Sequence, residues 1–283
     1  MNIIGLGKAG CNIAELFKQY PQYTVFKIDS DEKLKRKKNC MYIPKQSSVE
    51  LYDANPVDLK RLLKNLDEDE ECFLIVCGSG KISGCALWTL RQLKEAGQDI
   101  RIIYIKPELS TLDNMAKLRN RAHFHILQEY TRSGVFSKIF LIDNAKMPEI
   151  VGKAPVINYY SKTNEFIVST IHWYNIYRNT DPVFDTFRDE YVSSRICAFS
   201  YIDIEEQKET KTFSIENCNQ IKYFYGINRI TIEDDETLLD RLTAISLGEG
   251  NSPASISHGI YSTDLETGYS FAVHSSSDIQ EQE

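Results

Sequence analysis

The first 145 residues alternate between short apolar runs and helical patterns, and this alternation limits the fold more than any other sequence feature. Apolar runs lie at 1–5, 23–29, 73–76, 100–105 and 139–142. Helical spacing follows the first run as far as residue 20 and recurs at 56–66, 85–96 and 114–134. Alternation of this kind predicts an α/β fold with a doubly wound, mostly parallel sheet, which binds ligands at the carboxyl ends of its strands.

The second half of the chain has a different texture. Residues 157–178 have the pattern of one long helix, and period-two alternation follows at 196–204, 222–232, 254–261 and 269–273, with one helix at 236–245. Strands with a single helix indicate a smaller α+β domain. We therefore expect a first domain at 1–155, a central linking helix at 156–180, an α+β domain at 181–275 and a disordered tail at 276–283.

Charge and cysteine content narrow the function. The formal net charge of −7 disfavours nucleic acid and anionic membrane as main partners. The basic run at 33–38 breaks this pattern, and we interpret it as a solvated face. Seven cysteines, several of them in apolar runs, suit reduced thiols in a cytoplasmic protein. No stretch approaches the roughly 20 apolar residues of a membrane span, and no Cys/His spacing predicts a metal site.

A glycine loop follows the first predicted strand. Gly5, Gly7 and Gly10 have the dinucleotide spacing G-x-G-x-x-G, and Asp29 ends the second strand, where a ribose partner would lie. Glycines let a backbone approach a diphosphate, and the following helix offers free N–H groups. The motif alone fits an NAD enzyme, a nucleotide-phosphate binder, or tight strand–helix packing.

A second glycine loop at 78–84 again separates a strand from a helix. Two such loops facing one cleft would supply amides to both ends of a polyphosphate, and Lys81 would add positive charge. A nicotinamide enzyme needs no second loop of this kind. The Walker spacing is missing, which argues against the P-loop class.

These loops resemble those of the tubulin/FtsZ superfamily. The stretch 5–12 resembles the FtsZ loop G-x-G-G-x-G-x-N, 28–31 is similar to the N-T-D after the second strand, and 54–56 matches the A-N-P of the third loop. The stretch 78–84 is similar to the tubulin motif G-G-G-T-G-T/S-G, and Lys106-Pro107 lies where the family has K-P. C-terminal segments at 225–239 and 257–275 also resemble the family in order.

The resemblance implies a set of nucleotide-contacting residues. Tyr160 and Asn164 are four apart on the long helix and so share a face, where the ring would stack on the base and the amide would read the guanine edge. The full implied set is Gly5, Gly7, Gly10, Cys11, Asn12, Asp31, Gly78, Ser79, Gly80, Lys81, Ser83, Gly84, Arg121, Asn144, Tyr160 and Asn164. Arg121 as a surface residue, Tyr160 as core and Asn12 as a helix-start hydrogen-bonder are the alternatives.

Three departures from the family concern the phosphate end and catalysis. Leu51-Tyr52-Asp53 replaces the glycine-rich third loop, where Asp53 would repel a γ-phosphate. Lys81 and Ile82 replace threonine and glycine, and a β-branched residue restricts the backbone there. The family's acids after the central helix have no clean match. Asp181 and Asp185 are the candidate catalytic pair, whereas ungapped counting brings Asp189 to the last acid.

The sequence therefore predicts a guanine-nucleotide-binding protein that assembles head-to-tail with itself into cytoskeletal filaments. GTP and GDP are the expected ligands, with Mg²⁺ as a candidate companion and no protein metal ligand. GTP hydrolysis is expected to be weak or lost. A non-catalytic structural relative is the alternative, and an NAD(P)-dependent oxidoreductase is the remote one.

Overall fold

A single twelve-stranded sheet runs through the part of the chain that the computed structural model describes, residues 1–66, 71–152, 155–248, 253–266 and 268–281. Its strand order is β3-β2-β1-β4-β5-β6-β8-β12-β10-β11-β7, and β9 pairs with β8. The strands are β1 Asn2–Leu6, β2 Thr24–Asp29, β3 Cys40–Tyr42, β4 Glu71–Cys77, β5 Asp99–Lys106, β6 Lys138–Asp143, β7 Phe184–Asp185, β8 Ile196–Asp203, β9 Lys208–Lys211, β10 Gln220–Asn228, β11 Ser255–Thr263 and β12 Ser270–Ser276.

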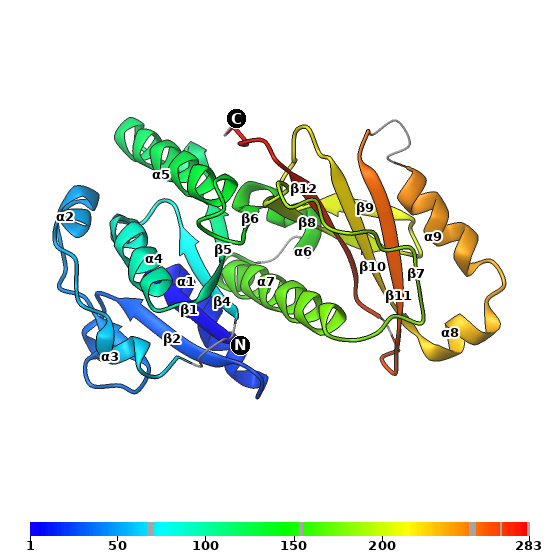
Figure 1. Ribbon diagram of the computed structural model, residues 1–283, viewed down its shortest axis with the longest axis horizontal. Helices are drawn as coiled ribbons and strands as arrows, with labels where there is room; N and C mark the ends of the chain where they lie inside the picture. The colour runs from blue at the N-terminus through cyan, green and yellow to red at the C-terminus, as the bar shows by residue number, and fades with distance from the viewer. Residues whose placement is uncertain (67–70, 153–154, 249–252, 267, 282–283) are drawn as a thin grey trace.

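Helices cover both faces of the sheet (Figure 1). They are α1 Gly7–Leu16, α2 Val49–Ala54, α3 Lys60–Leu63, α4 Ala86–Glu95, α5 Asn114–Arg132, α6 Met147–Val151, α7 Val156–Arg178, α8 Arg229–Asp234 and α9 Leu238–Leu247. Five short 3₁₀ segments are η1 Phe17–Gln19, η2 Glu32–Leu34, η3 Lys81–Cys85, η4 Leu109–Thr111 and η5 Asn144–Lys146.

The N-terminal six strands form the parallel, doubly wound part that the sequence predicts. Neighbouring residues of a strand point to opposite faces, so Ile4 packs under α4 and α5 while Ile3 packs under α1 and α7. Both faces are therefore buried, which explains the continuous apolar runs of these strands.

The two halves of the molecule share one sheet. Strand β6 pairs in parallel with β8 through Ile139↔Ile196 and Leu141↔Ala198, so the N-terminal sheet continues into the mostly antiparallel C-terminal strands. Helix α7 packs against both parts, because Ile171 and Tyr174 belong to the same buried cluster as Phe73 and Phe271. Helix α7 occupies most of the stretch expected as a linking helix at 156–180, and the sheet continues across it.

A third buried cluster lies under α9, against the opposite face of the C-terminal strands (Figure 1). Leu242 is fully buried there beside Tyr223 and Tyr225. The strand expected to reach residue 232 ends earlier, and α8 begins at Arg229. The reason is local, because the Asn228 side chain caps α8 by accepting a hydrogen bond from the Ile230 N–H at 2.9 Å.

The tail expected to be disordered at 276–283 is instead packed over its described part, residues 276–281. Gln280 is only 1% exposed. Its backbone N–H donates to Gln128 Oε1 at 2.8 Å, and its carbonyl accepts from Gln128 Nε2 at 3.1 Å. The prediction was wrong because polar composition was equated with disorder, whereas a buried glutamine on α5 needs polar partners.

The helix expected at 56–66 is reduced to the four residues of α3. Tertiary contacts hold the residues that precede α3. The Leu59 N–H donates to the Gln92 side chain at 2.8 Å, and the Gln92 side chain donates to the Val57 carbonyl at 2.9 Å.

Candidate functional site

The first glycine loop packs more tightly than a ligand site alone would require. A Cβ at Gly5 would lie 2.4 Å from the Gly10 carbonyl oxygen, and one at Gly10 would lie 2.4 Å from the Ile75 oxygen. Helix α1 therefore sits directly on β1 and β4. Gly7 opens the helix in the left-handed region, with a φ of 71°. The N-cap residue, Leu6, makes no side-chain hydrogen bond to the first turn of α1, so the N–H groups of this turn lack a side-chain cap.

Cys11 and Asn12 lie on α1 with different degrees of burial. Cys11 is buried, and its thiol donates to the Gly5 carbonyl at 3.3 Å. Burial raises the pKa of this thiol to about 12, so it stays protonated and stabilises the loop through this hydrogen bond. Asn12 is exposed on α1. Neither residue lines the cavity described below.

The aspartates after β2 organise their own turn. Asp31 is exposed, and its carboxylate accepts from the Lys33 N–H at 2.9 Å, which caps η2. Asp29 is partly buried and accepts from the Ser30 N–H at 2.7 Å. Burial raises the pKa of Asp29.

The second glycine loop is fixed by buried polar groups. The Gly78 N–H donates to the Ile105 carbonyl at 3.1 Å. A Cβ at Gly78 would come within 2.0 Å of both the Tyr104 hydroxyl and the Asn120 amide, which hydrogen-bond each other at 2.7 Å. Asn120 is therefore a positioning residue that sequence reasoning missed. An asparagine inside an apolar helix face was its only signal.

The rest of the second loop packs against α2 and the first glycine loop. Residues 81–85 form η3, and a Cβ at Gly84 would lie 2.2 Å from the Val49 carbonyl, because α2 packs on this turn. Ile82 reaches across to the first loop, where its Cγ2 lies 2.5 Å from the position of a Gly7 Cβ. Gly80, Lys81 and Ser83 belong to the same turn, and the Lys81 side chain is exposed.

A cavity of about 260 Å³ lies between these loops and the N-terminal end of α7. It brings together four predicted residues, Ser79, Asn144, Tyr160 and Asn164. Its other walls are Ala9, Ile13, Cys77, Ile105, Pro107, Glu108, Thr111, Leu112, Tyr159, Thr163 and Ile167. The predicted glycines flank the cavity from α1 and η3 without lining it.

Tyr160 stands at the mouth of this cavity and is 65% exposed. Its ring meets that of Tyr159 edge to face, with centroids 5.3 Å apart. The Tyr159 hydroxyl donates to the Asn144 carbonyl at 3.1 Å and so ties the loop after β6 to α7. Tyr159 and Thr163 lie one residue before Tyr160 and Asn164, so the helical spacing that found one pair could have indicated the other.

A buried ion pair holds the turn that carries Asn144. Lys106 Nζ and Asp143 Oδ2 are 2.8 Å apart, and both side chains are about nine-tenths buried. The other carboxylate oxygen, Asp143 Oδ1, accepts from the Ala145 N–H at 2.9 Å. The Lys106-Pro107 motif therefore positions Asn144 through Asp143.

Three predicted residues lie elsewhere. Arg121 is exposed on α5 and pairs with Glu281 at 3.4 Å, outside the cavity. Asp181 and Asp185 follow the far end of α7 and are exposed, and Asp185 pairs with Gly259 in the β7–β11 ladder. Tyr160 is near the start of α7, so the helix from Tyr160 to its end at Arg178 rises by about 27 Å before these aspartates.

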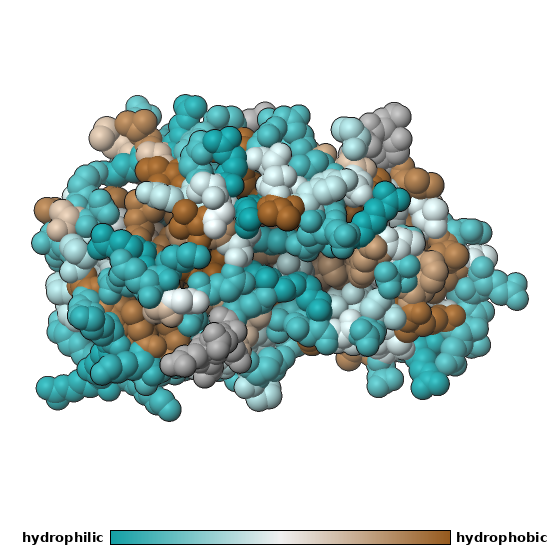
Figure 2. Space-filling model, viewed as in Figure 1, coloured by the Kyte–Doolittle hydropathy of each residue, from teal (hydrophilic) through white to brown (hydrophobic). Residues whose placement is uncertain are grey.

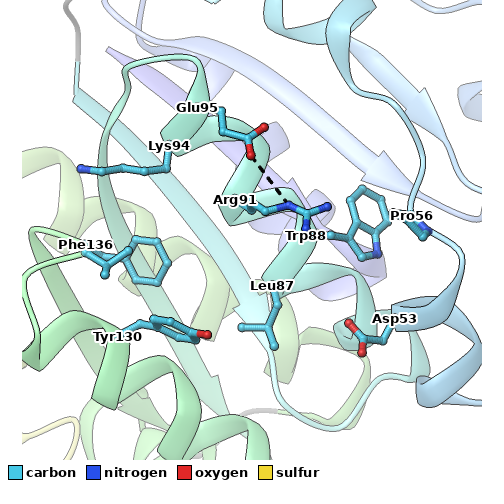
Figure 3. Close-up of a pocket in the computed structure, with 10 residues that line it drawn as sticks. Asp53, Pro56, Leu87, Trp88, Arg91, Lys94, Glu95, Tyr130 and Phe136 are labelled. Carbon is cyan, nitrogen blue, oxygen red and sulfur yellow. Dashed lines mark ion pairs between the residues drawn. The ribbon is translucent and has the colours of Figure 1, made fainter.

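A larger cavity of about 490 Å³ lies away from this site, between α4 and α5 (Figure 3). Trp88, Tyr130 and Phe136 line it, and Asp53 points toward it beside Trp88. The expectation that Asp53 faces a γ-phosphate is therefore not met. Residues 49–54 form α2 in place of a glycine-rich loop, and this turns the Asp53 side chain to another wall. We base the site on the smaller cavity because it lies at the strand ends and gathers the predicted groups.

Among the described residues, no group of three or more His, Cys, Asp or Glu side chains is arranged to hold a metal ion. No helix in the described ranges is long and apolar enough to cross a membrane.

These features define a class of fold, in which a doubly wound parallel sheet continues into a mostly antiparallel one and a long central helix packs against both. The chain has the fold of the tubulin/FtsZ superfamily. It is similar to an empty FtsZ dimer of M. jannaschii, with a TM-score of 0.70 and 14% identity over 97% of this chain and 87% of that one. It is also similar to a GTPγS-form protofilament of TubZ from Bacillus thuringiensis serovar israelensis, with a TM-score of 0.71 and 15% identity over 97% and 86%.

A helical model of a two-stranded TubZ-Bt filament gives a TM-score of 0.74 with 14% identity, covering 97% of this chain and 83% of that one. No protein-family model matches the sequence, and no curated protein matches it. At these identities the likeness establishes the fold, which the sequence motifs had predicted.

Proposed function

We propose that the protein binds a guanine nucleotide in the cavity at the N-terminal end of α7. The observation that supports this most is the convergence of Asn144, Tyr160 and Asn164 from two segments on one cavity beside the two glycine loops. The exposed ring of Tyr160 offers a stacking face, and the two amides offer both donors and acceptors to a base edge.

The phosphates would extend from this cavity toward α1 and η3. The uncapped N-terminus of α1 provides N–H groups and the positive end of its dipole, which favours an anion. Lys81 is the exposed cation of the second loop. Mg²⁺ would arrive with the phosphates of a triphosphate, and we assign it no protein ligand.

Calorimetric titration with GTP, GDP and ATP tests the assignment. We expect saturable binding of GTP and GDP and much weaker binding of ATP, because the asparagine amides would recognise a guanine edge. Absence of binding by all three nucleotides would rule the proposal out. Cofactor absorbance of the purified protein addresses the remote oxidoreductase alternative, for which a second glycine loop has no use.

Head-to-tail self-assembly into filaments is the second part of the proposal. The nucleotide cavity and the acids Asp181 and Asp185 lie at opposite ends of α7, so one copy could present its acids to the cavity of the next. A heterologous contact of this kind does not close and generates filaments. The related TubZ structures are described as protofilaments and filaments.

Sedimentation across a concentration series tests assembly. We expect the protein to pellet above a critical concentration with GTP, and substitution of Asp181 by Arg to raise that concentration. A protein that binds nucleotide yet stays in the supernatant at all concentrations would refute assembly while leaving nucleotide binding intact.

Turnover is proposed to be weak or lost. The Ile82 side chain lies against Gly7, between the two loops that would hold the phosphates. Asp181 and Asp185 are exposed and far from the cavity of their own chain, so they could act only on a neighbouring copy. Phosphate release measured at high protein concentration distinguishes this from an active GTPase, because robust release would contradict it and would exclude the non-catalytic alternative.

A further inference from the structure

A strongly basic hollow lies at the N-terminal edge of the sheet, away from the nucleotide cavity. It has a volume of about 310 Å³ and is lined by Arg36, Lys37, Lys38, Asn39, Cys40, Arg61, Leu62 and Asn65. Four of these residues are cations and none is an acid, although the whole chain carries a net charge of −7. The sequence suggested a solvated basic run, and the fold adds Arg61 of α3 to it.

The backbone gathers the consecutive cations on one wall. Arg36 and Asn39 have left-handed φ values of 65° and 55°. Both bends are held by hydrogen bonds, since the Lys37 N–H donates to the Leu34 carbonyl at 3.2 Å and the Asn39 carbonyl accepts from Lys27 at 3.0 Å. In an extended or helical segment, adjacent side chains would point apart. Here residues 36–40 all line the same hollow.

The cations of the hollow have no ion-pair partners among the described residues. None of Arg36, Lys37, Lys38 and Arg61 makes an ion pair with a described residue, whereas nearby Lys35 and Lys60 pair with Glu32 and Asp58. Arginine forks and lysines in one concave site are suited to a ligand that carries several phosphate oxygens.

We propose that this basic hollow is a second binding site, for the phosphate groups of a polyanion. The ligand would be either a nucleic-acid backbone or a soluble polyphosphate compound. Four exposed cations within one hollow can contact several anionic groups at once, and the phosphates of a polyanion supply a matching charge density. This site is independent of the nucleotide cavity, so the two proposals can fail separately.

Two probes distinguish the sources, a 20-base-pair DNA duplex and inorganic tripolyphosphate, both titrated in excess GDP to occupy the nucleotide cavity. The test variant replaces Arg36, Lys37, Lys38 and Arg61 by Gln. The control variant replaces four other exposed cations, Arg91, Lys94, Lys117 and Arg132, by Gln. A milder pair, Lys37→Gln with Arg61→Gln, covers the case in which the fourfold variant loses its fold by circular dichroism.

At 50 mM salt we expect the wild type to bind at least one probe and the test variant to bind it about 10- to 100-fold more weakly. The control variant should lose much less. For the duplex, the slope of log affinity against log salt should shrink by about 3 in the test variant. Duplex binding identifies nucleic acid as the source, and binding of tripolyphosphate alone identifies a soluble compound.

Three results would overturn the proposal. They are no binding of either probe by the wild type, unchanged binding by the test variant, and equal losses in test and control variants. Loss of self-association in the test variant, with no phosphate binding by the wild type, would assign the hollow to a protein contact instead. Residues 67–70, which are acidic in the sequence and lie outside the described ranges, are left unchanged in every variant.

Discussion

The two ends of the candidate nucleotide site are built in opposite ways. At the end where the base would bind, Tyr160 is exposed, and Asn144 and Asn164 line a cavity. Packing within the protein does not account for these side chains. At the phosphate end, Gly5 and Gly10 are required by helix–sheet contact, Gly78 by a buried Tyr104–Asn120 pair, and Gly84 by α2.

This contrast shows how strongly each motif indicates a ligand. A glycine that is needed for packing would be kept with or without a phosphate nearby, so the glycine loops alone are weak evidence of binding. Exposed aromatic and amide groups around a cavity are stronger evidence of binding, because contact with a ligand accounts for them and packing within the protein does not. The polar base end therefore supports nucleotide binding better than the glycines do.

The largest expected effect is on the fold at the phosphate end. Substituting Gly10→Ala places a Cβ 2.4 Å from the Ile75 carbonyl oxygen, a backbone atom that cannot move aside cheaply. We expect the free energy of unfolding to fall by about 3 kcal/mol or more, measured by denaturant titration without nucleotide.

Gly152→Ala is the matched control for that substitution. Gly152 has a left-handed φ of 72°, which Gly10 does not share, and a Cβ there meets nothing within 4 Å. It should cost only about 1 kcal/mol, from backbone strain alone. If Gly10→Ala lowers the free energy of unfolding no more than Gly152→Ala does, Gly10 is not required by packing. Its presence would then again be evidence of a bound ligand.

Acidification is expected to lower the free energy of unfolding. Burial lowers the pKa of His172 on α7 and of His123 behind the second loop to about 4 each. The neutral form is favoured in the folded state, so their contribution is complete above the unfolded pKa near 6.5 and is lost as the pH falls from 6.5 toward 4. The loss should be about 1–3 kcal/mol per group by pH 4, measured by denaturant titrations across this range.

Single variants separate the two histidines. His123→Leu should flatten part of this pH dependence, because both ring nitrogens lack partners among the described residues and no hydrogen bond is lost. His172→Leu should flatten another part but also remove a contact to the Tyr23 hydroxyl at 3.0 Å. A stability that stays constant from pH 6.5 to 4 would contradict the neutral, buried state of both rings.

Tyr160→Ala tests the base end directly. Because the ring is exposed, unfolding stability should change by less than about 0.5 kcal/mol. Loss of base stacking should weaken GDP binding by about 1–3 kcal/mol, roughly 5- to 150-fold. Tyr130→Ala, on α5 and 46% exposed, is the control and should leave GDP affinity unchanged. Equal affinities for all three proteins would remove Tyr160 from the site.

Ile82→Gly gives the smallest expected effect and asks whether the phosphate end is obstructed. Removing the side chain that lies against Gly7 should raise the affinity for GTP relative to GDP by about threefold, or about 0.7 kcal/mol. The fold should lose about 1 kcal/mol, since Ile82 packs against the core and glycine loosens the turn. An unchanged GTP to GDP ratio would show that Ile82 does not restrict phosphate access.

Local patterns predicted most of the fold. The apolar runs gave β1, β2, β4, β5 and β6 nearly to the residue, and the 3.6-residue spacing gave α4, α5 and α7. Short elements such as β3, α2 and β9 were missed because they carry too few residues to show a period and are held by contacts with distant segments. The tail was missed because its partner, Gln128, is 152 residues away from Gln280.

For the site, the amino-acid sequence was enough to identify the candidate ligand-binding side chains. Helical spacing put Tyr160 and Asn164 on one face, and the motifs after the strands pointed to Ser79 and Asn144. Which of these side chains line one cavity followed only from the packing of the folded chain. It placed Arg121 on Glu281, turned Asp53 toward another cavity, buried Cys11 and drew Arg61 beside the basic run. The physical reason is that sequence spacing fixes side-chain direction within one element, whereas convergence depends on how separate elements pack.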